Sequence, residues 1–446
     1  SIAGGGGYVS ETDGSDEYVI TFGASGNMRA TAGSVTVNNT GDLLLTTSDY
    51  SPSLVAQSIG GGGGYALISA KTGGQTRIGA TNNSLGENNS GNVVVNNRAV
   101  LYTKGKYSTA LTAQTIGGGG GVISSAASSL ALGTKNHLGS AKSGNVDVTN
   151  RNIIQTDGDY SGGIIVQTIG AGGGYIAGSS GGSAVLGAVN GLSSTLGTSG
   201  NLTLRSEGAS IKTSGIGSTA ILAQSIGGGG GFVGTANDEV TLGGTDLSQI
   251  SSGNVDVTNS SLISTTGAGS AGLIAQSIGG GGGVVTMTST EKITLGGVGV
   301  IDSLASSVSV KNTGDITTTG VASPLIMVQS IGGGGGFTTL QNDDVVADST
   351  NTIQLGSKQS VRAKGGSITV KNSGNLYSKG RSSSALVAQS IGGGGGNIRR
   401  LTLNPFESNL QLGSVESQAG SSGSITVENT GSFITTEGAY ARALLV

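Results

Sequence analysis

The stretch Ala56–Gly64 has the sequence AQSIGGGGG, and closely similar stretches recur along the chain. Glycine loses more conformational freedom on folding than any other residue, at a cost of roughly 0.5–1 kcal/mol relative to alanine. A run of five glycines is therefore either a flexible linker or a backbone segment that close packing holds in place. The rest of the sequence decides between these two interpretations.

The composition excludes several classes of protein. The 446 residues include 87 glycines but only 3 prolines, with no cysteine and no tryptophan. Collagen is excluded because it needs glycine at every third position. Charged residues make up 11 % of the chain, so the high-charge profile of disordered proteins is absent too. The net charge is −3 and the basic residues form no stripe, which argues against a nucleic-acid partner.

The chain consists of internal repeats. The Ser-Ile or Thr-Ile pair before each glycine run divides it into units of 52 to 60 residues. A period of this size indicates a stacked array in which neighbouring repeats bury a shared core. We treat the whole chain as a single array and expect it to be a slice of a longer molecule, because both ends fall at nearly the same phase of the repeat. The eight units are 1–57, 58–114, 115–167, 168–224, 225–276, 277–329, 330–389 and 390–446.

Three sets of residues recur at matched positions in these units. A glutamine precedes each Ser-Ile or Thr-Ile pair, an asparagine closes an alternating segment, and an aromatic residue often follows the glycine run. The glutamines are Gln57, Gln114, Gln167, Gln224, Gln276, Gln329 and Gln389. The asparagines are Asn39, Asn97, Asn150, Asn259, Asn312, Asn372 and Asn429, with Ser206 in the remaining unit. The aromatic residues are Tyr8, Tyr65, Tyr175, Phe232 and Phe337.

The segments between the glycine runs are typical of short strands. They alternate apolar and polar residues, are rich in Val, Ile and Thr, and end at Gly, Asn or Ser, as in Val35–Asn39. We predict an all-β fold, a parallel β-solenoid (β-helix) in which each unit supplies about five strands and stacks on the next. With two coils per unit and about 4.8 Å per coil, the array would span roughly 75–80 Å.

In-register stacking would place the asparagines of successive units above one another. Their side-chain amides would then form a hydrogen-bonded ladder along the axis. Asparagine also tolerates the left-handed conformation of tight turns, which would explain the same positions without a ladder. The sequence leaves both interpretations open.

The glycine runs are predicted to be ordered. Their length hardly varies, a strand always leads into them and a bulky residue often follows, whereas a flexible linker needs none of these features. Without Cβ atoms, neighbouring coils can approach main chain to main chain, as a β-like ribbon or as a threefold helix similar to polyproline II. The bare backbone would also offer a contact face to a second copy of the molecule.

A longer phrase joins these elements, as Gly423–Asn429, Gly431–Gly438 and Ser384–Gly396 illustrate. This phrase resembles the passenger regions of large autotransporter-type surface proteins of Gram-negative bacteria, and the resemblance extends over all eight units. It implies secretion across two membranes, a right-handed β-helix and display at the cell surface through a C-terminal translocator barrel. Passengers of that family include adhesins, fibres, proteases and esterases, so the resemblance does not fix the function.

The search for catalytic and ligand-binding motifs gives no convincing site. Gly178–Gly182 fits the G-x-S-x-G pattern of a nucleophile elbow, but no helix is predicted after the serine. His137 is the only histidine and has no obvious acidic partner. Asp147 and Asp256 share one phase of two units, as paired carboxylates of a polysaccharide-cleaving enzyme would, yet we interpret them as outward solubilising charges. We therefore predict no enzyme, no cofactor and no metal site.

We expect a structural protein, an extracellular stalk or fibre at the surface of a Gram-negative cell. It would be adhesive or associate with itself through glycine-rich faces, as a homopolymer or lateral bundle, or it would contact the cell surface and glycans. The alternatives are a β-helix enzyme that degrades polysaccharides, a glycan-binding passenger and an ice- or surface-binding solenoid. Thr317–Thr319 favour ice binding, but Tyr102 and Lys212 break the regular array that it needs. A glycan or receptor site would lie in variable segments such as Gln341–Thr350.

Overall fold

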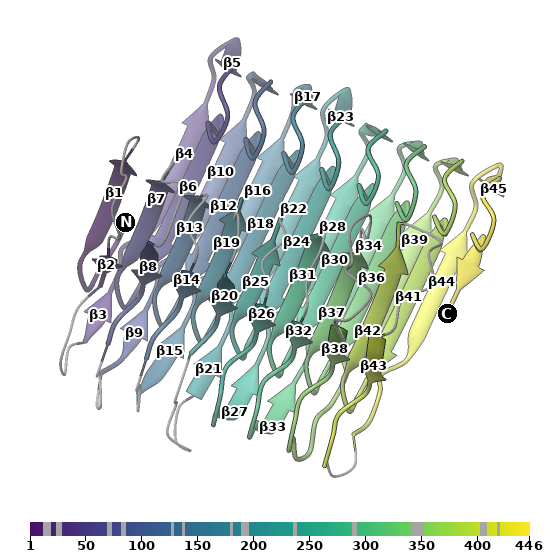
Figure 1. Ribbon diagram of the computed structural model, residues 1–446. Coiled ribbons are helices and arrows are strands. Elements are labelled where there is room, and N and C mark those ends of the chain that lie inside the picture. Colours follow the sequence, from purple (N-terminus) through teal and green to yellow (C-terminus); the bar gives the residue numbers. More distant parts are fainter. Residues whose placement is uncertain are drawn as a thin grey trace.

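The computed structural model describes the chain except for residues 12–18, 24–28, 69–73, 82–85, 126–128, 136–138, 179–181, 189–195, 235–238, 288–291, 341–350, 402–407 and 417–419. The described residues form strands and turns and contain no helix. The strands belong to six parallel sheets that run the length of the molecule, one coil above the next (Figure 1). The predicted parallel β-solenoid is confirmed.

Each repeat unit makes one coil. Gly6 of β1 (Gly6–Glu11) pairs with Gly63 of β7 (Gly63–Ile68), and this step of one unit recurs in every sheet. The prediction of two coils per unit is therefore wrong. Five of the sheets have eight strands, so seven spacings of about 4.8 Å give a stack roughly 34 Å high rather than 75–80 Å. Local sequence patterns indicate the strands but not how many sheets close one coil, so they do not fix the number of coils per unit.

Two of the sheets lie inside the coil, and we name them after their recurring residues. The glutamine sheet contains β6 (Leu54–Ile59), β12 (Leu111–Ile116), β18 (Ile164–Ile169), β24 (Ile221–Ile226), β30 (Leu273–Ile278), β36 (Ile326–Ile331), β41 (Leu386–Ile391) and β46 (Leu444–Leu445). The glycine sheet contains β1, β7, β13 (Gly120–Ser125), β19 (Gly173–Ala177), β25 (Gly230–Val233), β31 (Gly282–Met287), β37 (Gly335–Leu340) and β42 (Gly395–Arg400).

Two sheets follow the glycine sheet along each coil. The leucine sheet contains β2 (Val19–Phe22), β8 (Gln75–Ile78), β14 (Ser129–Leu132), β20 (Ser183–Leu186), β26 (Glu239–Leu242), β32 (Lys292–Leu295), β38 (Asn351–Leu355) and β43 (Ser408–Leu412). The short sheet contains β3 (Ala30–Thr31), β9 (Asn88–Asn89), β15 (Ser140–Lys142), β21 (Leu196–Thr198), β27 (Ser248–Ser251) and β33 (Ile301–Leu304).

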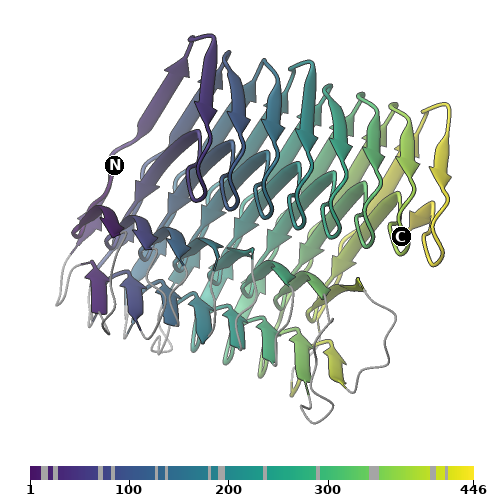
Figure 2. The same ribbon diagram turned by 45° about the horizontal axis from the view of Figure 1, so that its top comes forward.

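The last two sheets complete the coil before the chain re-enters the glutamine sheet (Figure 2). The asparagine sheet contains β4 (Val35–Asn39), β10 (Val93–Asn97), β16 (Val146–Asn150), β22 (Leu202–Ser206), β28 (Val255–Asn259), β34 (Val308–Asn312), β39 (Ile368–Asn372) and β44 (Ile425–Asn429). The threonine sheet contains β5 (Leu43–Thr46), β11 (Val100–Thr103), β17 (Ile154–Thr156), β23 (Ser210–Thr213), β29 (Leu262–Thr265), β35 (Ile316–Thr318), β40 (Leu376–Ser378) and β45 (Ile434–Thr436).

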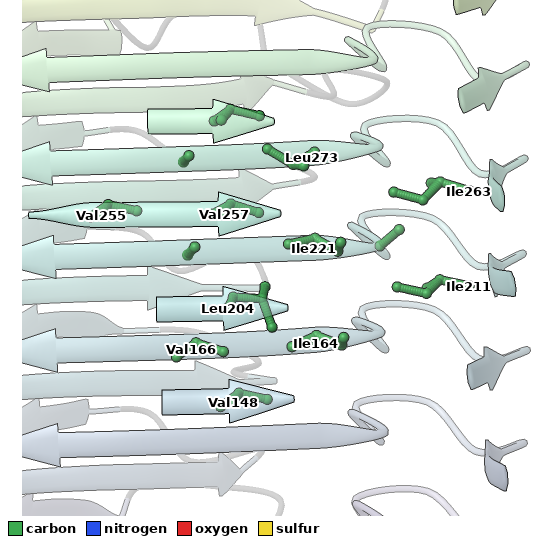
Figure 3. Close-up of a cluster of buried hydrophobic side chains, with 14 of the residues drawn as sticks. Val148, Ile164, Val166, Leu204, Ile211, Ile221, Val255, Val257, Ile263 and Leu273 are labelled. Carbon is green, nitrogen blue, oxygen red and sulfur yellow. The ribbon is translucent and has the colours of Figure 1, made fainter. Parts of the chain in front are cut away.

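The three largest of six apolar clusters run along the stack as cores. The first lies between the glutamine sheet and the asparagine and threonine sheets, and Figure 3 shows Ile221 and Val257 within it. Leu222, the next residue after Ile221, points the other way and packs with Phe232 of the glycine sheet in the second core. Val233 belongs to the third core, against the leucine sheet. The glutamine sheet is thus buried on both faces, which explains why its strands read as nearly continuous apolar runs.

The glycine runs form the turn between the glutamine and glycine sheets. Gly227 and Gly228 donate backbone hydrogen bonds to the next coil, whereas Gly230 donates to the preceding coil, so the run is ordered and held from both sides. The last two residues of this run, Gly230 and Gly231, belong to a parallel sheet. Of the two ordered forms that the sequence left open, they therefore adopt the β-like one. In the inner coils the runs are buried, as Gly60–Gly64 illustrate, so they present no glycine-rich lateral face to a partner. That part of the sequence interpretation is corrected.

The geometry of the glycine pair explains why no other residue fits. Gly230 and Gly231 have φ values of +131° and +144°, which L-residues rarely adopt. A Cβ atom on Gly231 would lie 1.9 Å from the carbonyl oxygen of Gly174 in the preceding coil, and one on Gly230 would lie 2.0 Å from that of Gly282 in the next coil. The missing side chains would therefore point along the solenoid axis, in opposite directions, into backbone.

We predict that Gly231→Ala lowers the free energy of unfolding by more than about 4 kcal/mol, because the clash is with backbone that cannot move away. Gly7→Ala is the matched control: Gly7 occupies the equivalent position with φ +152°, but no atom lies within 4 Å of its added Cβ. Gly7→Ala should cost only the backbone strain, about 1–3 kcal/mol. Chemical denaturation measures both, and equal losses would contradict the steric explanation.

Candidate functional site: ladders along the solenoid axis

The recurring glutamines form one ladder through the interior. Each Nε2 group donates a hydrogen bond to Oε1 of the glutamine in the next coil, at distances between 2.6 and 2.8 Å. In three coils the same Nε2 group also donates to a glycine carbonyl of its own coil, as Gln224 does to Gly231 at 3.3 Å. A primary amide suits this site because it is neutral and carries both a donor and an acceptor.

The recurring asparagines form a second ladder in the asparagine sheet. Asn97 Nδ2 donates to Asn150 Oδ1 at 2.8 Å, and also to the carbonyl of Ala99 two residues ahead at 2.8 Å. The same pair of bonds recurs at Asn312. The ladder that the sequence left open is therefore present, whereas none of the recurring asparagines has a positive φ, so the left-handed turn conformation does not explain these positions.

The asparagine ladder is interrupted in the fourth coil. Ser206 replaces asparagine there, and its Oγ pairs with Ser261 Oγ at 2.8 Å. Asn259 Oδ1 in the fifth coil is consequently buried without a hydrogen-bond partner in the structure. A buried acceptor that loses its partner carries its full desolvation cost, typically about 1–3 kcal/mol.

We predict that Ser206→Asn completes the ladder and raises the free energy of unfolding by about 1–3 kcal/mol. The new amide would accept from Asn150 and donate to Asn259. Ser264→Asn, at the outward position of β29, introduces the same side chain outside the ladder and should change stability by less than about 0.5 kcal/mol. Thermal denaturation compares the three chains, and a Ser206→Asn variant no more stable than the Ser264→Asn variant would refute the proposed gap.

A third ladder was missed by the sequence analysis. Ser108, Ser161, Ser218, Ser270, Ser323 and Ser383 lie above one another, and each backbone N–H from Ser108 to Ser323 donates to Oγ of the next serine at 2.8 to 3.0 Å. These serines recur at one phase of the repeat, so the signal was present in the sequence. It was hidden because serine is common throughout the chain.

The aromatic residues that follow the glycine runs face the glutamine sheet. Tyr175 and Phe232 are stacked with ring centroids 5.1 Å apart, and Phe337 is fully buried. Tyr8 and Tyr65 are also stacked, at 5.6 Å. Tyr175, Phe232 and Phe337 belong to the second core and Tyr65 packs against it, whereas Tyr8 in the first coil is largely exposed.

A further aromatic column lies at the turn that enters the glutamine sheet. Tyr50, Tyr107 and Tyr160 have φ values of 53° to 57°, and successive rings are parallel at 4.9 and 5.3 Å. Tyr175 Oη donates to the carbonyl of Tyr160 at 3.2 Å, and Tyr65 Oη donates to that of Tyr50 at 3.1 Å. The two aromatic columns are therefore joined by hydrogen bonds at Tyr50 and at Tyr160.

Burial raises the pKa of several of these phenols. The pKa of Tyr65 is raised to about 12 chiefly by burial, and burial also raises that of Tyr175. The folded chain therefore holds these protons more tightly than the unfolded chain, in which tyrosine titrates near pH 10. The associated stabilisation is complete below about pH 10 and is lost as the pH rises through the folded-state values.

We predict that the free energy of unfolding falls steeply between about pH 10 and pH 12. Tyr175→Phe should fold, because Phe232 occupies the equivalent position in the next coil, and should show a shallower decline. Denaturant unfolding at a series of alkaline pH values measures both slopes. A wild-type chain with no loss of stability in this window would contradict the assigned burial of the phenols.

The outer faces carry paired charges. The ion pairs join adjacent coils, and both partners are largely solvent-exposed, as in Lys292–Glu239 at 2.7 Å and Arg205–Asp147 at 3.0 Å. Such surface pairs contribute little stability, about 0–1 kcal/mol each. Their consequence is that charges of opposite sign lie above one another along the axis.

The carboxylates considered for catalysis are separated. Asp147 and Asp256 both face outward in the asparagine sheet, but Thr203 lies between them in the register, so they are two coils apart. Asp147 is occupied by its ion pair with Arg205. His137 and the serines of Gly178–Gly182 lie outside the described residues, as does Gln341–Thr350.

The sequence analysis also predicted no metal site and considered ice binding as an alternative function. Within the part of the chain that the structure describes, no group of three His, Cys, Asp or Glu side chains is placed to hold a metal ion. The outward column of the threonine sheet contains Tyr102, Gln155, Lys212 and Tyr377, so it forms no regular threonine array. Thr318, one of the threonines that favoured ice binding, is fully buried.

No protein family, curated protein or solved structure matches this chain. Among the described residues there is also no helix of the length and apolarity needed to cross a membrane.

Proposed function

We propose that this chain is a rigid structural element, one stretch of an extracellular stalk or fibre. The observation that carries the proposal is the buried glutamine ladder, which joins seven glutamines of successive coils without interruption. A chain of buried amide hydrogen bonds fixes the register of every coil, because a slip would leave donors and acceptors unpaired in a dry interior.

Stiffness follows from how many interactions cross each coil boundary. Parallel backbone pairing in five or six sheets, the glutamine and serine ladders and the apolar cores continue from one coil to the next. Bending at one boundary would disrupt all of these interactions together, so no boundary acts as a hinge. A stack of this kind keeps its ends at a fixed separation.

The outer surface supports the same proposal. Several of its charges form ion pairs between adjacent coils, and Asp147 and Asp256 lie two coils apart. The extracellular, cell-surface location is part of the proposal and rests on the resemblance of the repeats to autotransporter passengers. Adhesive or glycan-binding activity would belong to the variable loops, and we assign no residue to it.

We predict that single-molecule pulling from the two ends unfolds the chain coil by coil. Each step should release 52 to 60 residues, or roughly 170–220 Å of contour. Gly231→Ala should lower the force of the steps near the fourth and fifth coils. A smooth, low-force extension without steps would show a flexible chain and would refute the rigid element. Sugar released from polysaccharides by the purified chain would favour the enzyme alternative instead.

A further inference from the structure

Two lysines of the inner coils lie one above the other on the outer face of the asparagine sheet. Lys311 of β34 in the sixth coil is paired in register with Lys371 of β39 in the seventh, and both side chains are exposed. Both strands are paired along both of their edges, so this surface is a flank of the stack. Because paired residues of neighbouring parallel strands lie about 4.8 Å apart, the two ammonium groups share a small region of the surface.

This arrangement breaks a rule that the other strand pairs follow. Like charges directly opposite each other destabilise a sheet. Where other charged residues are paired in register, their charges are opposite, as in Glu239 with Lys292 and Lys371 with Glu428. A position that breaks a rule obeyed elsewhere in the same molecule is a candidate functional position.

The charge of Lys311 has no compensating carboxylate. None of the ion pairs of the described residues includes Lys311. Its register partner in the preceding coil is Thr258, and Asp256 of that coil is paired with Ser309 instead. The ammonium group of Lys311 is therefore available to an external anion.

A small cavity lies beside the two lysines. It has a volume of about 170 Å³, and its lining includes Lys311, Thr313, Lys371 and Ser373, all from inner coils. A cavity of roughly 150 Å³ accepts a benzene molecule. This one therefore has room for a carboxylate or sulfate group and for part of the molecule that carries it.

The charges around the cavity favour an anion. Glu428 also lines it and pairs with Lys371 at 3.5 Å, but both side chains are more than half exposed, so the ion pair is weak. Two ammonium groups and one carboxylate leave one net positive charge. Each ammonium group has three hydrogen-bond donors, and the hydroxyl groups of Thr313 and Ser373 are further donors.

The amides of the asparagine ladder line the cavity as well, but their hydrogens are in use. Asn312 Nδ2 donates to Asn372 Oδ1 and to the carbonyl of Gly314, both at 2.7 Å. Asn372 Nδ2 makes the same two bonds, to Asn429 Oδ1 and to the carbonyl of Gly374. A bound anion would therefore be held by the ammonium and hydroxyl groups.

We propose that this cavity binds an oxyanion, a carboxylate or sulfate group, between Lys311 and Lys371. The anion accepts a hydrogen bond from each ammonium group, and such charge-assisted bonds are stronger than neutral ones. Its negative charge offsets both the repulsion between the lysines and the net positive charge of the cavity. Because the site is on an exposed flank, the group is either a free ion or part of an acidic polysaccharide that continues outside the cavity. This inference goes beyond the proposed structural role, since it gives the rigid element a ligand.

Equilibrium dialysis with radiolabelled sulfate at low ionic strength tests the site directly. We expect one sulfate per chain, and Lys311→Gln should weaken binding at least tenfold. Lys212→Gln is the matched control: Lys212 is also exposed on an inner coil, but its register partners are Gln155 and Ser264. The control should change the affinity less than twofold. Absence of binding, or equal weakening by the two variants, would overturn the proposal.

Thermal unfolding tests the repulsion that the anion offsets. Without sulfate, Lys311→Gln should melt at or above the temperature of the wild-type chain, because it removes one of two like charges. Added sulfate should raise the melting temperature of the wild-type chain more than that of Lys311→Gln, since the general stabilising effect of sulfate is common to both. Equal increases would contradict a site at these lysines.

Polygalacturonate, a polymer of carboxylates, distinguishes the two sources of the oxyanion. Binding that is tighter than that of sulfate, and that is lost in Lys311→Gln and with the uncharged methyl ester of the polymer, assigns the site to acidic polysaccharides. Binding of sulfate without binding of the polymer assigns it to the free ion. Failure of both ligands overturns the site, and stepwise unfolding under force would still support the structural element.

Discussion

The structure depends on one constraint, the axial repeat of about 4.8 Å between coils. At this spacing each residue of a paired strand lies directly over its equivalent in the next coil, so these positions must tolerate contact with a copy of themselves or a close relative. A side-chain amide satisfies this requirement because its NH2 group donates to the next coil and its oxygen accepts from the preceding coil, as in the glutamine ladder. Hydroxyls and aromatic rings satisfy it as well, by relaying hydrogen bonds and by stacking in parallel.

The same axial repeat restricts charged side chains, because equal charges in adjacent coils repel each other. The ion pairs of the described residues place lysine or arginine beside aspartate or glutamate of an adjacent coil, although Lys311 lies in register with Lys371. In the interior, where a charge would be costly to bury, the ladders use neutral groups alone. The composition therefore follows from the repeat: few charges, many amides and hydroxyls, and aliphatic side chains that stack into continuous cores.

Glycine is needed where the backbone of an adjacent coil leaves no space for a Cβ atom. At Gly230 and Gly231 the backbone turns so that a side chain would point along the axis, where the neighbouring coil lies at hydrogen-bonding distance. The same kind of contact occurs at Gly133, where an added Cβ would lie 2.2 Å from the carbonyl oxygen of Gly187 in the next coil. The constancy of the glycine runs is thus a consequence of the stacking.

The sequence by itself determined the class of fold, since alternation of apolar residues and an internal period suffice to predict stacked parallel strands. It also identified the glutamines, the asparagines and the anchoring aromatics, because a residue that contacts its own copies must recur. The number of coils per unit was decided by the tertiary structure alone, because local patterns fix the strands but do not say how many sheets close one coil. The tertiary structure also revealed the partnerless Asn259 and the direction in which the glycine side chains would point, both of which depend on the position of the neighbouring coil.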